Sequence, residues 1–163
     1  MKSNAFFYLV CLCFTFSLIG CSNDDADLTP NDLEGKVTCK IDGTDFESTI
    51  ASATIGNGVF SMQGGTNEGQ TINITIGTGY NGVGRYSTGG VLSNINHVVT
   101  YVPSAVNATQ SWSSFGAPEN SGELNITSED GEWVEGTFSI VVFNVDSNAT
   151  KTLGEGSFRV KIN

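Results

Sequence analysis

Apolar and polar residues alternate with a period of two through most of this chain, and this pattern restricts it to β-structure. The clearest stretch is Thr-Ile-Asn-Ile-Thr-Ile at 71–76. Such alternation predicts a strand with one buried and one solvated face. The pattern begins at 36–41 and returns at 122–127 and 133–145. We therefore predict an all-β domain over residues 36–163.

Turn residues separate these stretches at short intervals. The chain contains 20 glycines and only three prolines, and Asp-Gly or Asn-Gly pairs stand at 42–43, 57–58 and 130–131. These pairs favour the tight turns of β-hairpins. Together with the spacing of the strands, they predict an antiparallel β-sandwich of about eight to ten short strands. The stretches 77–86 and 103–121 are predicted to form turns and irregular structure.

The first twenty residues differ from the rest and predict a leader. Lys2 is followed by fifteen uncharged, mostly apolar residues from Ala5 to Ile19. A membrane-spanning helix needs about 20 apolar residues, so this run is short for a span and typical of the helical core of a signal peptide. We therefore predict that residues 1–20 are removed.

The sequence Leu-Ile-Gly-Cys at 18–21 resembles the lipobox of bacterial lipoproteins. An apolar residue stands three positions before the cysteine, and a small residue stands directly before it. The resemblance implies that the signal peptidase reads Leu18, Ile19 and Gly20 and that Cys21 receives a lipid, which anchors the protein to the membrane. A thiolate is the nucleophile for this acylation, and each buried methylene contributes about 0.8 kcal/mol to membrane binding. The alternative is a plain secretory leader that ends near a cysteine.

The residues after Cys21 bear on the destination of such a lipoprotein. Ser22, in place of Asp, resembles the pattern that sorts lipoproteins to the outer membrane, and Asp24 and Asp25 resemble the acidic surface-export signal of Bacteroidota-type lipoproteins. These resemblances imply display at the cell surface, with the lipoprotein processing and export machinery as partners. Residues 21–35 contain five acidic residues and little to bury. They are predicted to be a disordered tether.

Charge and cysteine content exclude several classes of protein. All 17 acidic residues follow Cys21, whereas one of the seven basic residues, Lys2, precedes it, so the cleaved chain carries a net charge of −11. Nucleic acid is excluded as a partner because phosphate binding needs clustered Lys and Arg. Cys11 and Cys13 lie in the leader, and Cys21 is assigned to the lipid. Cys39 alone is left, so no intramolecular disulfide can form, and its place in the alternation predicts an inward, inert thiol.

Short glycine-containing motifs recur in the β-domain. They are Ile-Asp-Gly at 41–43, Gly-Arg-Tyr at 84–86, Gly-Glu-Leu-Asn-Ile-Thr at 122–127, Glu-Gly-Thr-Phe-Ser-Ile at 135–140 and Gly-Ser-Phe-Arg-Val at 156–160. In this order they resemble the small β-sandwich lipoproteins of Bacteroidota-type bacteria. The resemblance covers most of residues 36–163. The resemblance implies a β-sandwich fold and a location at the membrane, and it implies no catalytic residues.

The side chains that catalysis requires are sparse. His97 is the only histidine, and its place in a strand predicts packing, which leaves a Ser-His-Asp triad or a zinc site incomplete. Glu119, Glu123 and Glu135 could supply the carboxylate pair of a glycosidase, but any acidic protein offers such candidates. The acidic turn at 129–132 lacks the spacing of an EF-hand calcium loop. We therefore predict a protein that is not an enzyme and that needs no cofactor or metal.

Trp112 and Phe115 are the remaining candidates for a binding site. Both lie in the irregular stretch 103–121, which is rich in small residues. Their rings could stack on a sugar or anchor a protein partner, or they could plug the open end of the sandwich. We predict a surface lipoprotein that binds an extracellular glycan or protein through its loops. The alternatives are a structural or fimbria-like component whose edge strands pair with other subunits, and a polymer hydrolase.

Overall fold

The computed structural model describes residues 35–89, 97–117 and 121–163. These residues form eleven strands and one 3₁₀ helix. The strands are β1 (Lys36–Ile41), β2 (Thr44–Glu47), β3 (Ile50–Gly56), β4 (Val59–Gly65), β5 (Thr71–Ile76), β6 (Gly84–Thr88), β7 (His97–Val102), β8 (Trp112–Ser113), β9 (Gly122–Glu129), β10 (Trp133–Asn144) and β11 (Ala149–Lys161), and the helix is η2 (Ala105–Gln110). All pairs of neighbouring strands are antiparallel. The predicted all-β antiparallel architecture is confirmed.

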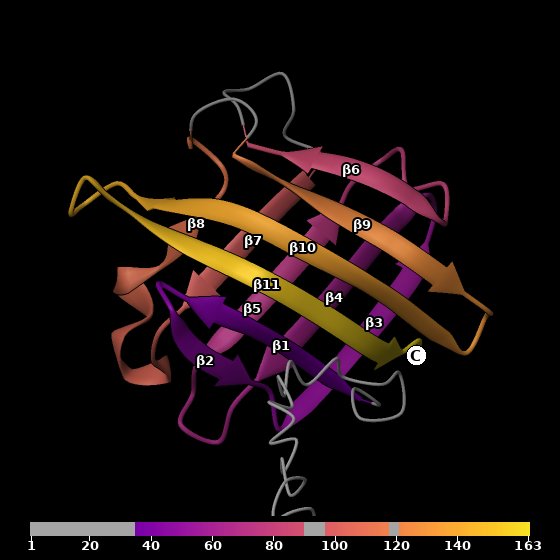
Figure 1. Ribbon diagram of the computed structural model, residues 1–163, viewed down its shortest axis with the longest axis horizontal. Helices are drawn as coiled ribbons and strands as arrows, with labels where there is room; N and C mark the ends of the chain where they lie inside the picture. Colours follow the sequence, from indigo (N-terminus) through magenta and orange to yellow (C-terminus); the bar gives the residue numbers. More distant parts are fainter. Residues whose placement is uncertain (1–34, 90–96, 118–120) are drawn as a thin grey trace, which may run out of the picture.

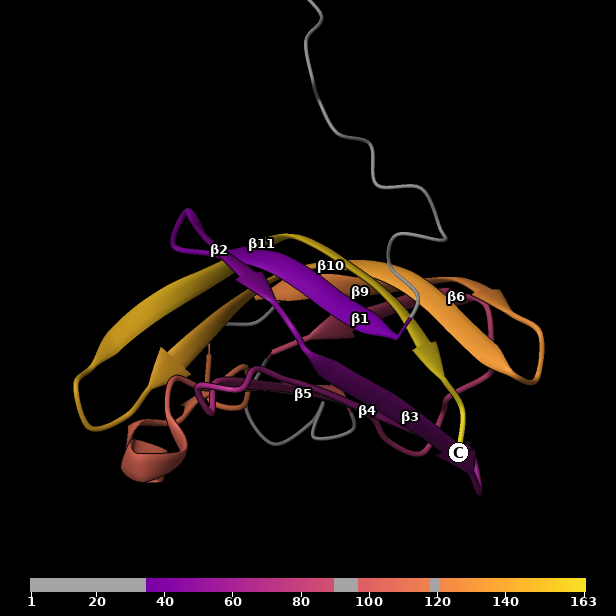
Figure 2. The same ribbon diagram turned by 90° about the horizontal axis from the view of Figure 1, so that it is seen from below.

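The strands hydrogen-bond into one sheet that curls over into two packed layers (Figure 1, Figure 2). Layer A contains β2, β1, β11, β10, β9 and β6 in that order. Layer B contains β3, β4, β5 and β7, followed by the corner strand β8. The strands of the two layers cross at a steep angle in Figure 1, as they do in orthogonally packed sandwiches.

Two corners join the layers. At the first corner, β10 leaves β9 and pairs with β8 through Phe143 and Ser113. At the second corner, the end of the chain meets β3: Ile162 forms a bridge with Ala53, and the Asn163 N–H donates to the Ala53 carbonyl at 2.9 Å. Layer B is therefore held to layer A along both of its sides.

Three short strands raise the count above the predicted total of about eight to ten. β2 directly follows the predicted turn at 42–43, β6 overlaps the end of the stretch 77–86 that is predicted to form turns, and β8 lies in the stretch predicted to be irregular. In β6 only Tyr86 and Thr88 are buried, and β8 is two residues long but pairs on both sides. Such strands carry too few alternating residues to be recognised from the sequence. Pairing with longer neighbours forms them.

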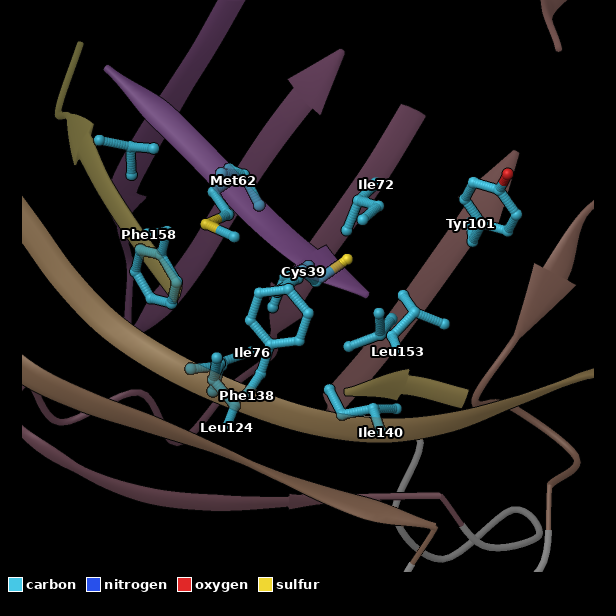
Figure 3. Close-up of a cluster of buried hydrophobic side chains, with 14 of the residues drawn as sticks. Cys39, Met62, Ile72, Ile76, Tyr101, Leu124, Phe138, Ile140, Leu153 and Phe158 are labelled. Carbon is cyan, nitrogen blue, oxygen red and sulfur yellow. The ribbon is translucent and has the colours of Figure 1, made fainter. Parts of the chain in front are cut away.

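The core lies between the layers and takes side chains from both (Figure 3). The largest side chains with almost no exposure include Phe60, Met62, Ile72, Leu124, Leu153 and Phe158. Cys39 belongs to the same cluster at 5% exposure, so its predicted inward orientation is confirmed. Burial raises the pKa of the Cys39 thiol to about 12, because a thiolate would be poorly solvated there. The thiol is therefore held in its neutral, unreactive form.

Two phenylalanines of the core pack on glycines of the neighbouring strand. Phe138 of β10 pairs with Gly156 of β11, and Gly136 of β10 pairs with Phe158 of β11. A Cβ on either glycine would come within 2.5 Å of the facing ring. Each ring thus occupies the space that a side chain would otherwise fill. The Gly-Thr-Phe and Gly-Ser-Phe motifs of the sequence are the two halves of this reciprocal packing.

Candidate functional site

The residues that carry the predicted lipid attachment and sorting lie outside the described part of the chain. They are Leu18, Ile19, Gly20, Cys21, Ser22, Asp24 and Asp25. Within 35–89, 97–117 and 121–163, no helix is long and apolar enough to cross a membrane. Of the predicted site residues, Trp112 and Phe115 are the two that the structure describes.

Trp112 lies at the corner where the two layers meet. It stands on β8 opposite Tyr101 of β7, and its indole is half-buried and packs against the core. The ammonium of Lys151, on β11, lies 4.9 Å from the centroid of the ring, a cation–π contact that covers part of the indole. Trp112 therefore helps to close the end of the sandwich, and only the remainder of its ring can meet a ligand.

Asp42 fixes the position of Lys151. The Lys151 ammonium donates to Asp42 Oδ2 at 2.7 Å, and the Thr152 N–H donates to Oδ1 at 2.8 Å. These bonds, that from Lys151 foremost, lower the pKa of the Asp42 carboxyl, because they stabilise its charged form. The carboxylate thereby balances the charge of the Lys151 ammonium and holds it over the Trp112 ring.

A hollow of about 330 Å³ opens beside Trp112. Its other lining residues are Gln110 at the end of η2, Asn144 at the end of β10, and Asp146 and Ser147 in the turn between β10 and β11. Its volume is at the lower end of the range for sites that take small ligands. The hollow therefore has room for a compact group rather than for a large cofactor.

Asn144 builds the wall of this hollow. Its side chain is 5% exposed, its amide donates to the Ser111 carbonyl at 2.8 Å, and its Oδ1 accepts from the N–H and the hydroxyl of Ser147 at 2.7 and 2.8 Å. These bonds hold the segment after η2 against the β10–β11 turn. The Gln110 amide and the Asp146 carboxylate are exposed, and neither bonds to another side chain among the described residues. These two groups are left for a ligand.

The chemistry of the hollow suits an uncharged polar ring compound. The indole offers a flat apolar surface, and an amide beside a carboxylate can both donate hydrogen bonds to hydroxyl groups and accept them. Asp146 repels anions, and the neighbouring cation, Lys151, is already held by Asp42. In the part of the chain that the structure describes, no group of three or more His, Cys, Asp and Glu side chains could hold a metal ion.

Phe115 is not brought into this hollow. It follows β8, is 47% exposed, and donates its N–H to the Ser113 hydroxyl at 3.0 Å. The two aromatic residues proposed from the sequence therefore do not form one platform. Gln110, Asn144 and Asp146 could not be recognised from the sequence, because these polar residues belong to no motif and Gln110 lies more than thirty residues before the other two.

Residues 34–160 match the family described as Domain of unknown function (DUF6252). The chain belongs to this family. The match runs from β1 to Val160 of β11, so the DUF6252 domain includes both layers and the Trp112 hollow. No curated protein and no solved structure matches the chain. The family description names no activity.

A second hollow of the DUF6252 domain, about 420 Å³, lies on the outer face of layer A. Its two carboxylates are engaged in ion pairs: Glu123 with Arg85 at 3.1 Å and Glu155 with Lys40 at 2.6 Å. Phe138 lies at its base but is 4% exposed. The second hollow therefore offers a ligand neither an exposed ring nor an unpaired carboxylate.

The other residues considered from the sequence have structural contacts in the DUF6252 domain or lie outside the described residues. Glu135 pairs with Arg159 at 2.7 Å, and Glu119 is not among the described residues. The His97 ring meets the Tyr86 ring edge-on, with 5.6 Å between their centroids. His97 is thus packed at the start of β7, as its strand position predicts.

The acidic turn between β9 and β10 is organised by one carboxylate. Asp130 Oδ1 accepts from the N–H groups of Glu132 and Trp133 at 2.9 and 2.7 Å. These backbone bonds, that from Trp133 foremost, lower the pKa of the Asp130 carboxyl. Glu129 accepts the Tyr80 hydroxyl at 2.5 Å. Asp130 therefore stabilises the turn, whereas Glu129 bonds to Tyr80 and Glu132 pairs with Lys161 at 3.1 Å.

Proposed function

We propose that this protein is an outer-membrane lipoprotein, displayed at the surface of a Bacteroidota-type bacterium, and that its β-sandwich binds an extracellular glycan without catalysing a reaction. The address is supported by the lipobox-like sequence 18–21 and by Ser22, Asp24 and Asp25, which resemble sorting and export signals. The net charge of −11 after cleavage favours a domain that stays off an anionic membrane surface.

One observation carries the binding part of the proposal. The Trp112 indole, partly covered by Lys151, lines a hollow of about 330 Å³ beside Gln110 and Asp146, whose side chains bond to no other side chain among the described residues. Sugars combine a flat C–H surface with hydroxyl groups, which an aromatic ring and a neighbouring amide and carboxylate can meet together. The arginine contacts of Glu123 and Glu135 favour a binding protein over a glycoside hydrolase, which needs a free pair of carboxylates.

The binding proposal is tested with the full-length lipoprotein, extracted from membranes in detergent and applied to an array of glycans. We expect Trp112→Ala to weaken binding by about tenfold or more, since aromatic contacts dominate such sites. Phe115→Ala removes an exposed aromatic residue outside the hollow and serves as the control that keeps binding. An array that stays empty, or equal losses in the two variants, would contradict the proposal.

A structural role, with strands added at the sheet edges, has less support. Among the described residues, β2 pairs only with β1, and β6 pairs only with β9. These edge strands are four and five residues long and carry Asp45, Glu47 and Arg85, and the third edge strand, β3, is bridged at Ala53 by Ile162. Short, charged edges are how proteins prevent strand addition. A series of cross-linked oligomers on intact cells would support the structural role.

A further inference from the structure

Charge is divided unequally between the two layers. The five strands of layer B contain no Asp, Glu, Lys or Arg, although 15% of the chain is charged. The basic residues of the described part all lie on strands of layer A. Each forms an ion pair: Lys36–Glu47, Lys40–Glu155, Arg85–Glu123, Lys151–Asp42, Arg159–Glu135 and Lys161–Glu132. The strands of layer B, the lower layer in Figure 2, therefore present no Asp, Glu, Lys or Arg side chain to the outside.

Most of the outward side chains of layer B are hydroxyls and amides, which stand in rows beside the outward aliphatic residues Ile50, Val59, Val98 and Val102. We use the name polar face for the set Ser52, Thr54, Ser61, Gln63, Asn73, Thr75, Thr100 and Ser113. The strand register places five of them in one row across the sheet, in the order Ser52, Gln63, Asn73, Thr100 and Ser113. Neighbouring strands are about 4.8 Å apart, so this row is about 19 Å long.

The polar face has unused hydrogen-bonding capacity. Within the described residues, its side chains bond to no other group of the protein, with one exception: the Ser113 hydroxyl accepts the Phe115 N–H at 3.0 Å. Ser52, Thr54 and Gln63 are exposed, and the others are half-buried by their neighbours in the sheet. Each hydroxyl can donate once and accept twice, and each amide can donate twice and accept twice. The row therefore offers both donors and acceptors along its whole length.

This chemistry excludes the charged classes of ligand. An anionic polymer needs free cations, and every cation of the described residues is held in a pair on layer A. A cationic ligand would find its partners on the acidic surfaces elsewhere and would gain nothing from an uncharged face. A protein partner fits poorly as well, because the centres of protein interfaces are rich in aromatic residues, Met and Arg, and the polar face contains none of these.

We propose that the polar face of layer B binds an extended neutral polysaccharide, which lies across the strands along the Ser52–Ser113 row. Hydroxyls of successive sugar units exchange hydrogen bonds with Gln63, Asn73 and Thr100, and the open face of the sheet admits a longer chain than the Trp112 hollow could hold. Neither partner carries charge, so binding does not weaken with salt. The proposal stands on this face alone and does not depend on the Trp112 hollow.

The test uses the full-length lipoprotein in detergent and measures its retardation in native gels that contain a neutral glucan or mannan. Thr75→Val with Thr100→Val removes two hydroxyls of the polar face and preserves side-chain shape and strand preference. Thr150→Val with Thr152→Val makes the same change on layer A, outside both hollows, and is the matched control. We expect retardation to fall about tenfold in the first variant. A second variant, Gln63→Ala with Asn73→Ala, should lose at least as much. Retardation should persist in the layer A control and, for the wild-type chain, at high salt.

Several outcomes would overturn the proposal. One is a wild-type chain that no neutral polysaccharide retards, or that only an anionic polysaccharide retards. Another is a loss that the layer A control shares. A dimer in light scattering that the polar-face variants dissociate would identify a second copy of the chain as the occupant. Retardation that Trp112→Ala abolishes and the polar-face variants leave intact would overturn this inference but support glycan binding in the hollow.

Discussion

Gly136 faces Phe158 across β10 and β11, and the phenyl ring lies where a side chain at position 136 would stand. A Cβ there would be 2.5 Å from Phe158 Cζ and also 2.5 Å from the carbonyl oxygen of Asn125 on the other neighbouring strand. The ring is 1% exposed, and the carbonyl belongs to a paired strand. Neither atom can move away without disturbing the core.

Gly136→Ala is therefore expected to lower the free energy of unfolding by about 2–3 kcal/mol, as overpacked core positions do. Gly56→Ala is the control, because a Cβ at the end of β3 would meet nothing within 4 Å, and we expect a change within about 0.5 kcal/mol. Urea unfolding of both variants measures the difference. Equal stabilities would contradict the packing described for Phe158.

Cys39 makes stability depend on pH in the alkaline range. Its pKa rises from an ordinary value of 9.0 to about 12 in the folded chain. Between these pH values the unfolded chain loses the thiol proton and the folded chain keeps it, so the free energy of unfolding falls as pH rises through this window. Below pH 9.0 both states keep the proton and the contribution is constant.

Cys39→Ala should therefore show a shallower loss of stability between pH 9.0 and about 12 than the wild-type chain. Urea unfolding at a series of pH values measures the two slopes. Burial foremost raises the pKa of Tyr101 as well; this contribution acts in the same direction and is common to both chains, apart from the smaller part of it that comes from the charge of Cys39. Parallel curves would mean that the thiolate is accommodated in the folded state.

Asn144 is expected to be the most sensitive residue of the Trp112 hollow. Asn144→Ala removes three hydrogen bonds to Ser111 and Ser147 and should cost about 2 kcal/mol of folding free energy. Asp146→Ala, at an exposed position of the same hollow, should change stability by less than about 0.5 kcal/mol. Thermal unfolding monitored by circular dichroism compares them. A stable Asn144→Ala variant would show that the turn holds its place without this side chain.

Cys21→Ala tests the proposed address. Without the thiol no lipid can be attached, so we expect the leader to remain uncut and labelled palmitate to be absent from the protein. Ser22→Ala retains the thiol and should be processed and labelled as in the wild type. Immunoblotting and metabolic labelling of membrane fractions measure both properties. A Cys21→Ala protein that is still cleaved and labelled would refute the lipoprotein assignment.

The long strands of the fold could be predicted because their alternation extends over enough residues. In β5 and β10, buried and outward residues alternate as the sequence predicts. Cys39 faces inward with Val37 and Ile41, as the alternation in β1 predicts. β8 could not be predicted, because its two residues become a strand only through bonds to β7 and β10. The corner that β8 makes places Trp112 beside Lys151, a contact that no local pattern contains.

The two proposed binding surfaces differ in how far the sequence indicates them. The hollow depends on the meeting of Gln110 with Asn144 and Asp146, which only the tertiary fold produces. The polar face, by contrast, has a signal in the sequence, since Glu68 and Arg85 are the only charged residues between positions 50 and 102. That signal is a stretch without charge rather than a motif. The strand register is needed to show that its neutral residues form rows on one face of the sheet.

The second corner of the sandwich bears on the order in which the chain can fold. β11 is the last strand of the sequence, yet it lies between β1 and β10 in layer A and reaches β3 of layer B through Ile162. During N-to-C-terminal synthesis, neither layer can complete its pairing until this strand has emerged. Such long-range pairing delays folding; in the lipoprotein that we propose, this delay would help to keep the chain unfolded for passage across a membrane. The position of the final strand thus sets the moment at which the domain can become compact.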